Sequence, residues 1–307
     1  MGAVALDQFF RMVNIQSVLP VYILVGVLVK KIKIVTAESQ QSMIDLMINI
    51  TLPCMVFNSF QPGLSLKELM TAFEIILVAM GIIAFSYAVG KLLFRKIPFR
   101  QRSILQYGAM LSNSSFAGLP LVDSLYGQMG LFYGSLFILP NRIFLWTAGI
   151  SLFTDADAKT RLKNALLNPG IVAVELGILR MLTNFPVHPI AAEAIRNIGN
   201  CTGPMSMMMI GCILADNDPR TVFSKRAVAL SFVRLILLPL SALAALRLIG
   251  FDPVLTGVSV VLTGMPVATT TAILAQKYGA DAQFGSKCVF VTTVFSFVTA
   301  PILTLFL

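Results

Sequence analysis

The sequence predicts an all-α integral membrane protein whose ten transmembrane helices form two inverted five-helix repeats. Three observations lead to this fold class: an apolar composition, apolar segments that alternate with basic loops, and two pairs of matching motifs. Of the 307 residues, 57% are hydrophobic and 12% are charged, and the mean hydropathy is +0.84. A soluble domain carries about 25% charged residues. We therefore expect lipid to surround most of the chain.

Charged clusters and Pro/Gly turns divide the chain into segments of the length that crosses a membrane, which is about 20 mostly apolar residues. The first segment contains Arg11 and lacks a cleavage site, so we expect it to serve as its own insertion signal. The ten expected spans are residues 10–30, 42–61, 69–93, 103–122, 130–153, 166–184, 190–214, 227–249, 254–276 and 285–306.

Basic residues concentrate in alternate loops, as expected if this count of spans is correct. One side of the membrane receives sixteen Lys and Arg residues and the other receives five. Short basic loops stay in the cytoplasm, so we expect a multi-pass plasma membrane protein with both termini outside. The net charge of +9 then reflects topology and does not indicate nucleic-acid binding. The sixteen residues are Lys30, Lys31, Lys33, Lys91, Arg95, Lys96, Arg100, Arg102, Lys159, Arg161, Lys163, Arg220, Lys225, Arg226, Lys277 and Lys287.

Two motifs occur once in each half of the chain. An N-x-T-x-P motif spans Asn49–Pro53 and again Asn200–Pro204, and a G-x-P motif spans Gly118–Pro120 and again Gly264–Pro266. Because each half has an odd number of spans, the second half enters the membrane from the opposite face, which makes the repeats inverted. Interrupted helices at matching positions of two such halves point to a transporter's binding site. The expected repeats are residues 1–153 and 166–307.

The G-x-P motifs predict interruptions in the fourth and ninth spans. Proline lacks an N–H group, so backbone groups around Pro120 and Pro266 lose their helical partners. If the two interrupted helices cross at mid-membrane, helix ends of both signs meet there, and amide groups can hold a carboxylate. An alternative is that the nearby hydroxyl groups only join helices. The polar side chains beside the interruptions are Asn113, Ser114, Ser115, Thr269, Thr270 and Thr271.

Five charged residues fall inside expected spans, where an unpaired charge costs at least about 2.5 kcal/mol. They are Asp45, Glu74, Arg142, Glu175 and Arg234. We expect Arg142 to pair with Glu74, and Arg234 to find Glu175 or backbone carbonyls. The three carboxylates are also candidates for binding a coupling proton or ion, with a purely structural role as the alternative.

Nothing in the sequence indicates a metal, a cofactor or an enzyme. The four cysteines are scattered without C-x-x-C spacing, the single histidine lies in a Pro-rich loop, and no phosphate-binding G-x-x-x-x-G-K-[ST] motif occurs. We expect the methionines around 205–209 to pack flexibly rather than to bind metal.

Four segments resemble the auxin efflux carrier family, which includes plant PIN-type auxin exporters and bacterial permeases for malate and malonate. They are SNSSFAGLPLVDSLYG at 112–127, NPGIVAVELGI at 168–178, TGMPVATTTAILAQKYGADA at 263–282 and FSFVTAPI at 295–302. The loop at 154–165 is short, as is typical of the bacterial branch.

The resemblance implies a fold similar to those of bile-acid transporters and sodium/proton antiporters. It implies a scaffold at about 10–61 and 166–214, and a mobile transport domain at about 69–153 and 227–307. Substrate would lie beside the crossing of the fourth and ninth spans, against the scaffold. The substrate-binding residues that we expect are Asn113, Ser114, Ser115, Pro120, Met265, Pro266, Ala268, Thr269, Thr270, Asn49 and Asn200.

These observations together predict a secondary transporter or exporter of a small organic anion, such as malate, malonate or an auxin-like acid, working by an elevator-type displacement. One alternative is a sodium- or proton-coupled ion exchanger of the same fold, using Asp45, Glu74 or Glu175. Another is a non-transporting membrane sensor, and a membrane enzyme is poorly supported. The sequence leaves the oligomeric state open, with a homodimer among the alternatives.

Overall fold

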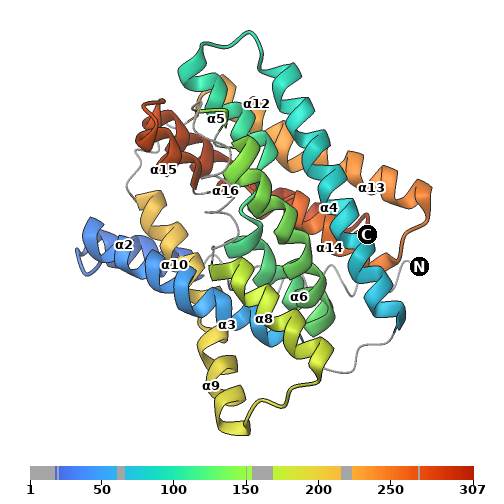
Figure 1. Ribbon diagram of the computed structural model, residues 1–307. Coiled ribbons are helices and arrows are strands. Elements are labelled where there is room, and N and C mark those ends of the chain that lie inside the picture. The colour runs from blue at the N-terminus through green and yellow to red at the C-terminus, as the bar shows by residue number, and fades with distance from the viewer. Residues whose placement is uncertain are drawn as a thin grey trace.

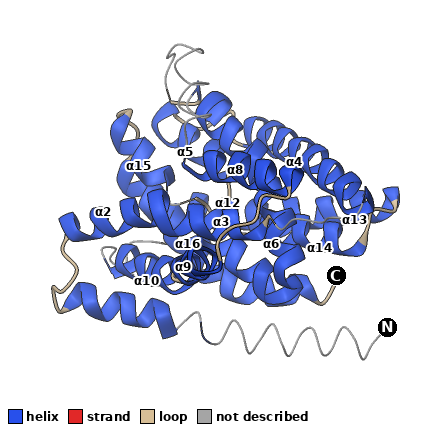
Figure 2. Ribbon diagram, turned by 60° about the horizontal axis from the view of Figure 1, so that its bottom comes forward, coloured by secondary structure: helices blue, strands red, loops and turns tan. Residues whose placement is uncertain are grey.

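The computed structural model is built from helices (Figures 1 and 2) and describes residues 18, 21–60, 66–149, 151–153, 169–215, 223–268 and 270–307. In chain order the helices are residues 21–31, α2 (Ala37–Leu46), α3 (Leu52–Ser59), α4 (Leu66–Leu93), α5 (Phe99–Met110), α6 (Leu119–Phe144), α8 (Pro169–Thr183), α9 (Pro189–Asn200), α10 (Thr202–Ala215), α12 (Lys225–Phe232), α13 (Leu238–Ile249), α14 (Pro253–Thr263), α15 (Thr270–Lys277) and α16 (Ala282–Thr304). Four π-helical turns join or extend them: η1 (Met47–Thr51), η2 (Ser114–Gly118), η3 (Leu145–Gly149) and η4 (Val233–Leu237).

Four helical stretches are long and apolar enough to cross a membrane. They are Ala37–Ser59, Met70–Leu93, Lys225–Ile249 and Ala282–Thr304. The prediction of an all-α membrane protein is therefore supported. The other expected spans correspond to helices that are shorter, interrupted or partly outside the described residues, so the ten-span inverted repeat stays a prediction.

Three of the π-helical turns lead directly into helices that begin with Leu-Pro. The pairs are Leu52-Pro53, Leu119-Pro120 and Leu238-Pro239. A proline in the first helical turn is tolerated because its missing N–H has no intrahelical partner there. Before Pro53 the result is one stretch, Ala37–Ser59, with a π turn inside it. In the matching motif, by contrast, Cys201 separates α9 from α10.

The helices pack in two neighbouring groups. In the first, α3 contacts α8 and α9, and α10 contacts α2 and α9. In the second, α4 contacts α5 and α6, α14 contacts α6 and α13, and α16 contacts α12 and α15. Figure 1 shows the first group at the lower left of the view and most of the second above and to the right. The groups touch where α6 meets α3 and α8, and where α10 meets η2 and α16.

Two glycines let the helix at 21–31 lie directly against the backbone of α10. A Cβ atom added at Gly26 would lie 2.0 Å from the carbonyl oxygen of Met208, and one added at Gly211 would lie 2.1 Å from that of Ile23. No larger residue fits at either position without moving a helix. Small residues at helix crossings are a common device of membrane proteins because lipid provides no hydrophobic force between helices.

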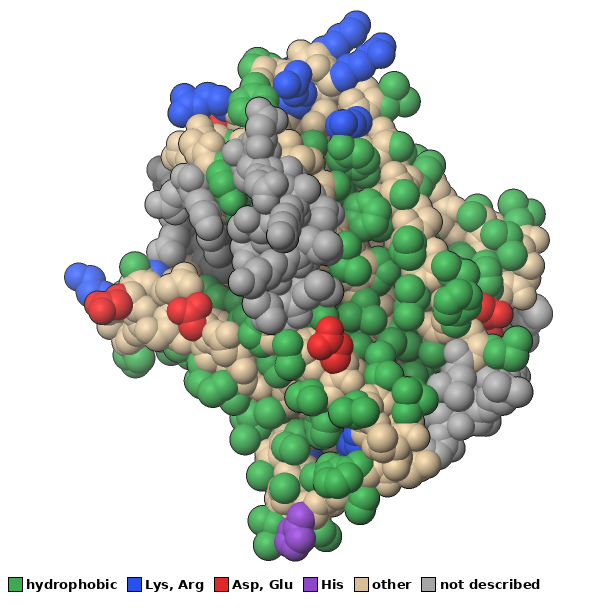
Figure 3. All heavy atoms as spheres, viewed as in Figure 1, with side chains coloured by type: hydrophobic (Ala, Val, Ile, Leu, Met, Phe, Trp, Pro, Cys, Tyr) green, Lys and Arg blue, Asp and Glu red, His purple; other side chains and the backbone are tan. Residues whose placement is uncertain are grey.

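The outer surface has the character of a lipid-facing one. Large apolar side chains are exposed on α4, where Phe73 is 64% and Leu77 is 51% exposed. Figure 3 shows apolar side chains across the middle of this face, with most of the visible Lys and Arg at the top and the single histidine, His188, at the opposite end. Cations at one end and an apolar middle are expected of a membrane-spanning protein. Which end faces the cytoplasm stays a prediction.

Candidate functional site

The two predicted interruptions lie side by side in the structure. The chain between α5 and η2 pairs with the chain between α14 and α15 through an isolated antiparallel bridge that joins Ser112 to Val267. The Asn113 amide donates to the Pro266 carbonyl at 2.7 Å, and the Ala268 amide donates to the Leu111 carbonyl at 3.3 Å. Two broken helices therefore meet through short extended segments, as the motifs predict.

The first interruption lies upstream of the proline that led us to expect it. The helical path stops at Met110 and resumes at Ser114, whereas Pro120 is the second residue of α6. Around Pro120 the backbone is helical, so the freed backbone groups are those of residues 111–113. The physical reason is that proline fits the first turn of a helix without breaking a hydrogen bond. Pro266 does lie inside the second interruption.

The carbonyl groups at the ends of α5 and α14 bind one buried arginine. Arg234, on η4, donates from Nη1 to Ala109 at 2.8 Å and to Met110 at 3.5 Å, from Nη2 to Thr263 at 2.6 Å, and from Nε to Met265 at 3.2 Å. The expectation that Arg234 binds carbonyls is thus correct, and its alternative partner Glu175 is not in contact with it.

Side chains also form hydrogen bonds with backbone groups in and beside the second interruption. Thr292 accepts from the Val267 amide at 3.1 Å, and the Ser112 hydroxyl donates to the Leu262 carbonyl at 3.0 Å. Val267 is fully buried and Met265 is 3% exposed. A freed backbone group in the membrane needs such a partner because no water is available to it. These backbone groups of the second interruption are therefore bonded to protein, although Met265 and Pro266 also line a pocket.

The first interruption borders a small cavity, which Ala268 and Thr270 also line. Its walls come from the two interruptions, from the end of α6 and from the start of η3. The lining residues are Leu111, Ser112, Asn113, Ser114, Ser115, Phe116, Ile138, Asn141, Arg142, Leu145, Ala268 and Thr270. Five of the predicted substrate-binding residues are among these: Asn113, Ser114, Ser115, Ala268 and Thr270.

Arg142 supplies the positive charge of this cavity. Its Nη2 atom donates to the Ser115 hydroxyl at 3.0 Å. Among the described residues no carboxylate lies within ion-pair distance of its guanidinium, so the expected Arg142–Glu74 pair does not form. The guanidinium has five N–H donors, and among the described residues only the bond to Ser115 uses one of them.

Asn113 adds a second unused donor. Its side chain is 4% exposed, and its Nδ2 atom has no hydrogen-bond partner among the described residues. Nor does the Asn113 side chain cap the start of η2, which has no side-chain cap. A buried donor without a partner costs free energy, so its presence beside Arg142 indicates a place where a ligand or water completes the bonding.

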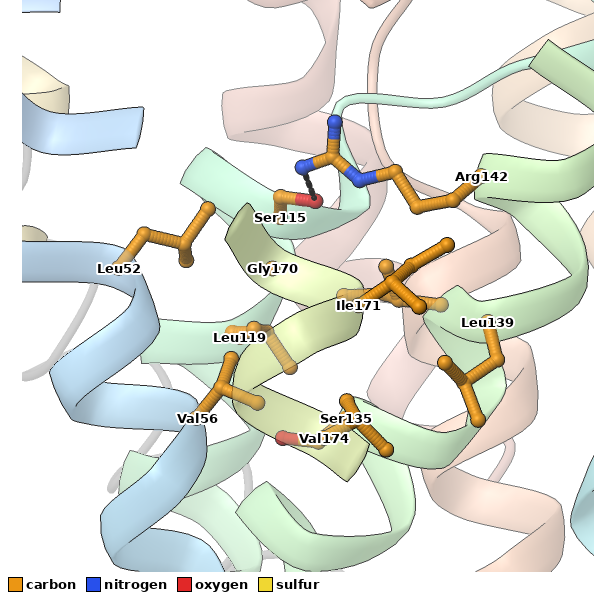
Figure 4. Close-up of a pocket in the computed structure, with 11 residues that line it drawn as sticks. Leu52, Val56, Ser115, Leu119, Ser135, Leu139, Arg142, Gly170, Ile171 and Val174 are labelled. Carbon is orange, nitrogen blue, oxygen red and sulfur yellow. Dashed lines mark hydrogen bonds between the residues drawn. The ribbon is translucent and has the colours of Figure 1, made fainter. Parts of the chain in front are cut away.

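A smaller cavity adjoins the first (Figure 4) and shares Ser115, Ile138 and Arg142 with it. Its other walls come from α3, with Leu52 and Val56, and from α8. Figure 4 shows the Arg142 guanidinium above this pocket, joined to Ser115. Arg142 therefore lies at the boundary between the two helix groups, where the interrupted helices face α3 and α8.

The remaining predicted residues lie elsewhere. Asn49 is exposed, donates to the Asp45 carbonyl at 2.7 Å and lines a separate groove of about 900 Å³ between α3, α8 and α9, while Asn200 is exposed at the end of α9. Met265 and Pro266 line a different pocket, of about 410 Å³, with Ile23 and Met207. Thr269 lies outside the described residues.

The three candidate ion-coupling carboxylates are also apart from the cavity. Asp45 is exposed and accepts from the Gln41 side chain at 3.0 Å, Glu175 is exposed on α8, and Glu74 is half-buried on α4. None of them lines the cavity that contains Arg142. The sequence places Arg142 as a charge within an apolar span and predicts an ion pair for it, whereas the structure places it in the cavity.

Comparisons with known proteins agree with a membrane carrier. A sequence model of the family described as membrane transport protein matches residues 13–165 and 155–304. A relative from Methanothermobacter thermautotrophicus, described as an uncharacterized transporter, is 24% identical over 285 residues, which cover 92% of this chain and 94% of the relative. Another uncharacterized transporter, from Methanocaldococcus jannaschii, is 24% identical over 289 residues, which cover 90% of this chain and 92% of the relative.

Proposed function

Because the chain belongs to the membrane transport protein family, the auxin efflux carrier family that its motifs resemble, we propose that it is a secondary active transporter of a small organic anion. The observation that carries this proposal is the Arg142 guanidinium, which faces a cavity at the crossing without a carboxylate partner among the described residues. A guanidinium binds a carboxylate or a phosphate through two parallel hydrogen bonds, and this geometry favours such anions over neutral solutes and cations.

The rest of the cavity supports an anion of modest size. Asn113 offers an unused amide donor, and the start of η2 offers backbone N–H groups with the partial positive charge of a helix N-terminus. Two small pockets adjoin at Arg142 and share Ser115 and Ile138, so a ligand bound there has to be compact. A cation in this place would be repelled by Arg142, which disfavours a sodium or proton exchanger that binds its ion here.

The proposed movement is a displacement of one helix group against the other. Residues 69–153 and 227–307 would form the transport domain, and residues 10–61 and 166–214 the scaffold. The contact between α6 and α3 supports this, because Leu52, Val56 and Leu119 border it with apolar side chains, and among the described residues the hydrogen bond across it joins the Ser59 and Ser135 hydroxyls at 3.3 Å. The plasma membrane location with both termini outside is part of the same proposal.

Ligand-dependent thermal unfolding tests the proposal. Purified protein is heated with malate, malonate, lactate or indole acetate, and a ligand that binds only the folded state raises the unfolding midpoint. At least one carboxylate is expected to raise it in a saturable way, whereas malonamide, which has the shape of malonate without its charge, is not.

Two arginine variants make this test specific to the site. Arg142→Gln is expected to weaken the binding of the active carboxylate by at least about tenfold, equal to 1.4 kcal/mol, and to abolish its uptake into proteoliposomes. Arg196→Gln is the matched control, because Arg196 is an exposed arginine on α9 that pairs with Glu193. Equal carboxylate affinities for Arg142→Gln and the wild type would overturn the proposal.

A further inference from the structure

Arg234 places a fixed positive charge where two broken helices end. The residue is 2% exposed, and its three guanidinium nitrogens donate to carbonyl groups of Ala109, Met110, Thr263 and Met265. Ala109 and Met110 end α5, and Thr263 ends α14. One side chain therefore binds the carbonyl ends of both interrupted helices.

Helix carbonyl ends attract cations. The last carbonyls of a helix have no intrahelical partner and carry a partial negative charge of about half an electron. Two such ends meet at this crossing, so their repulsion has to be balanced. In transporters with broken helices, unwound carbonyls and half-helix carbonyl ends are the groups that coordinate a coupling sodium ion or proton. In this chain those carbonyls are already bound by Arg234.

The surroundings hold Arg234 in this position. Its helix turn, η4, is followed by α13, whose second residue is Pro239, and the neighbouring Leu230, Leu235 and Leu238 are all buried. The helix end at α5 and the one at α14 belong to the same packed group as η4. The guanidinium therefore stays with the crossing whichever way that group moves.

We infer that Arg234 takes the place of a coupling cation: it assembles the crossing without a bound metal ion, and it makes transport independent of sodium and potassium. The part of the inference that concerns transport rests on the proposed function. The part that concerns assembly of the crossing does not, and it can be tested without a substrate.

The assembly part is tested by thermal unfolding in sodium, potassium or choline chloride at constant ionic strength. The wild-type midpoint is expected to be the same in all three salts. Arg234→Ala is expected to unfold at a lower temperature and to regain stability in a saturable way with millimolar guanidinium, which can enter the space left by the side chain. Arg247→Ala is the matched control, because Arg247 is an exposed arginine that also donates to carbonyls at a helix end, those of Phe306 and Leu307.

Three results would overturn the inference. They are a wild-type midpoint that rises saturably with sodium or potassium, an Arg234→Ala midpoint equal to that of the wild type, and an Arg234→Ala protein that guanidinium restores no more than it restores Arg247→Ala. If Arg234→Ala does not fold, the inference is tested by the unfolding midpoints of the wild type in the three salts and by that of Arg234→Lys. Lysine keeps the charge but reaches fewer carbonyls, so its midpoint is expected to lie below that of the wild type and to be insensitive to sodium.

The transport part is tested in proteoliposomes with an anion that the wild type carries. Uptake is expected to change by less than about twofold when choline replaces sodium and potassium, a difference well below the tenfold that 1.4 kcal/mol produces. Uptake that requires sodium would overturn the inference and leave the anion proposal intact. A lack of uptake of every carboxylate in every salt would count against the proposed function, while the thermal test of Arg234 would still stand.

Discussion

The two interruptions carry related G-x-P motifs but differ in what surrounds them. At the second, between α14 and α15, Arg234 and Thr292 bind the backbone, and Met265 and Val267 are buried. At the first, between α5 and η2, the side-chain Nδ2 atom of Asn113 has no partner among the described residues, and a cavity with Arg142 lies beside it. We call the second interruption closed, because protein groups bind its backbone, and the first open, because it keeps an unused donor beside a cavity with Arg142.

This difference separates two roles that the sequence suggests for both segments. A broken helix in a membrane needs partners for its freed backbone groups. At the second interruption, the side chains of Arg234 and Thr292 are such partners. Because Arg234 binds both α5 and α14, it also supplies partners for carbonyls at the end of α5. The donors of the first interruption are then available for a ligand. We expect substitutions at the second interruption to lower stability and those at the first to lower ligand affinity.

The largest effect is expected at Met265, which the sequence assigns to substrate binding. Its side chain is 3% exposed and packs in the core that includes Leu119 and Leu262. Met265→Ala should leave a cavity and lower the free energy of unfolding by about 2 to 5 kcal/mol, with no change in carboxylate affinity. Thermal unfolding measures the first and ligand titration the second. Met80→Ala, at an exposed methionine on α4, is the control. Lost affinity at unchanged stability would place Met265 in the site.

A smaller loss of stability is expected from Thr292→Val. The hydroxyl accepts from the Val267 amide and donates to the Cys288 carbonyl, so valine keeps the shape but leaves the Val267 N–H unpaired. A buried donor left without a partner costs about 1 to 3 kcal/mol. The neighbouring Thr293→Val is the matched control, because the Thr293 hydroxyl donates to the Val289 carbonyl of its own helix and has no other partner among the described residues. Equal unfolding midpoints for the two variants would show that the second interruption does not depend on this bond.

The fold could be predicted from the sequence where a pattern has one physical meaning. Apolar runs of about 20 residues indicate membrane helices, and the G-x-P pair led to two interruptions that do meet, at Ser112 and Val267. A proline has two meanings, because it breaks a helix from inside but starts one well. Pro266 lies in its interruption and Pro120 starts α6, and the motif alone does not distinguish these cases.

The site was harder to predict because side-chain partners depend on how helices are rotated and packed. Arg142 and Glu74 both fall in apolar spans, yet Arg142 bonds to Ser115 and Glu74 is elsewhere on α4. Asn113 could be predicted as a site residue directly from its position before the interruption. Asn49 and Asn200 were chosen from a matching motif, and both are exposed away from the cavity.

At the first interruption the expected effect is on affinity. Asn113→Ala removes an amide that has no partner among the described residues, so the free energy of unfolding should change by less than about 1 kcal/mol, because no made hydrogen bond is lost. Carboxylate affinity should fall by about tenfold if the amide binds the ligand. Asn141→Ala is the matched control, since Asn141 lines the same cavity but donates to the Phe137 carbonyl. An affinity loss no larger than that of Asn141→Ala would remove Asn113 from the site.

The smallest effect is expected at Ser115, which holds Arg142 through one hydrogen bond of 3.0 Å. Such a bond contributes about 0.5 to 1.5 kcal/mol net, so Ser115→Ala should lower carboxylate affinity by about two- to tenfold while Arg142 keeps its charge. Ser112→Ala provides the comparison within the same short segment, because the Ser112 hydroxyl bonds to the Leu262 carbonyl of α14. It should lower the unfolding midpoint and leave affinity unchanged. If both serine variants changed the same property, the boundary between the closed and open interruptions would not lie between residues 112 and 115, and the proposed division of roles would fail.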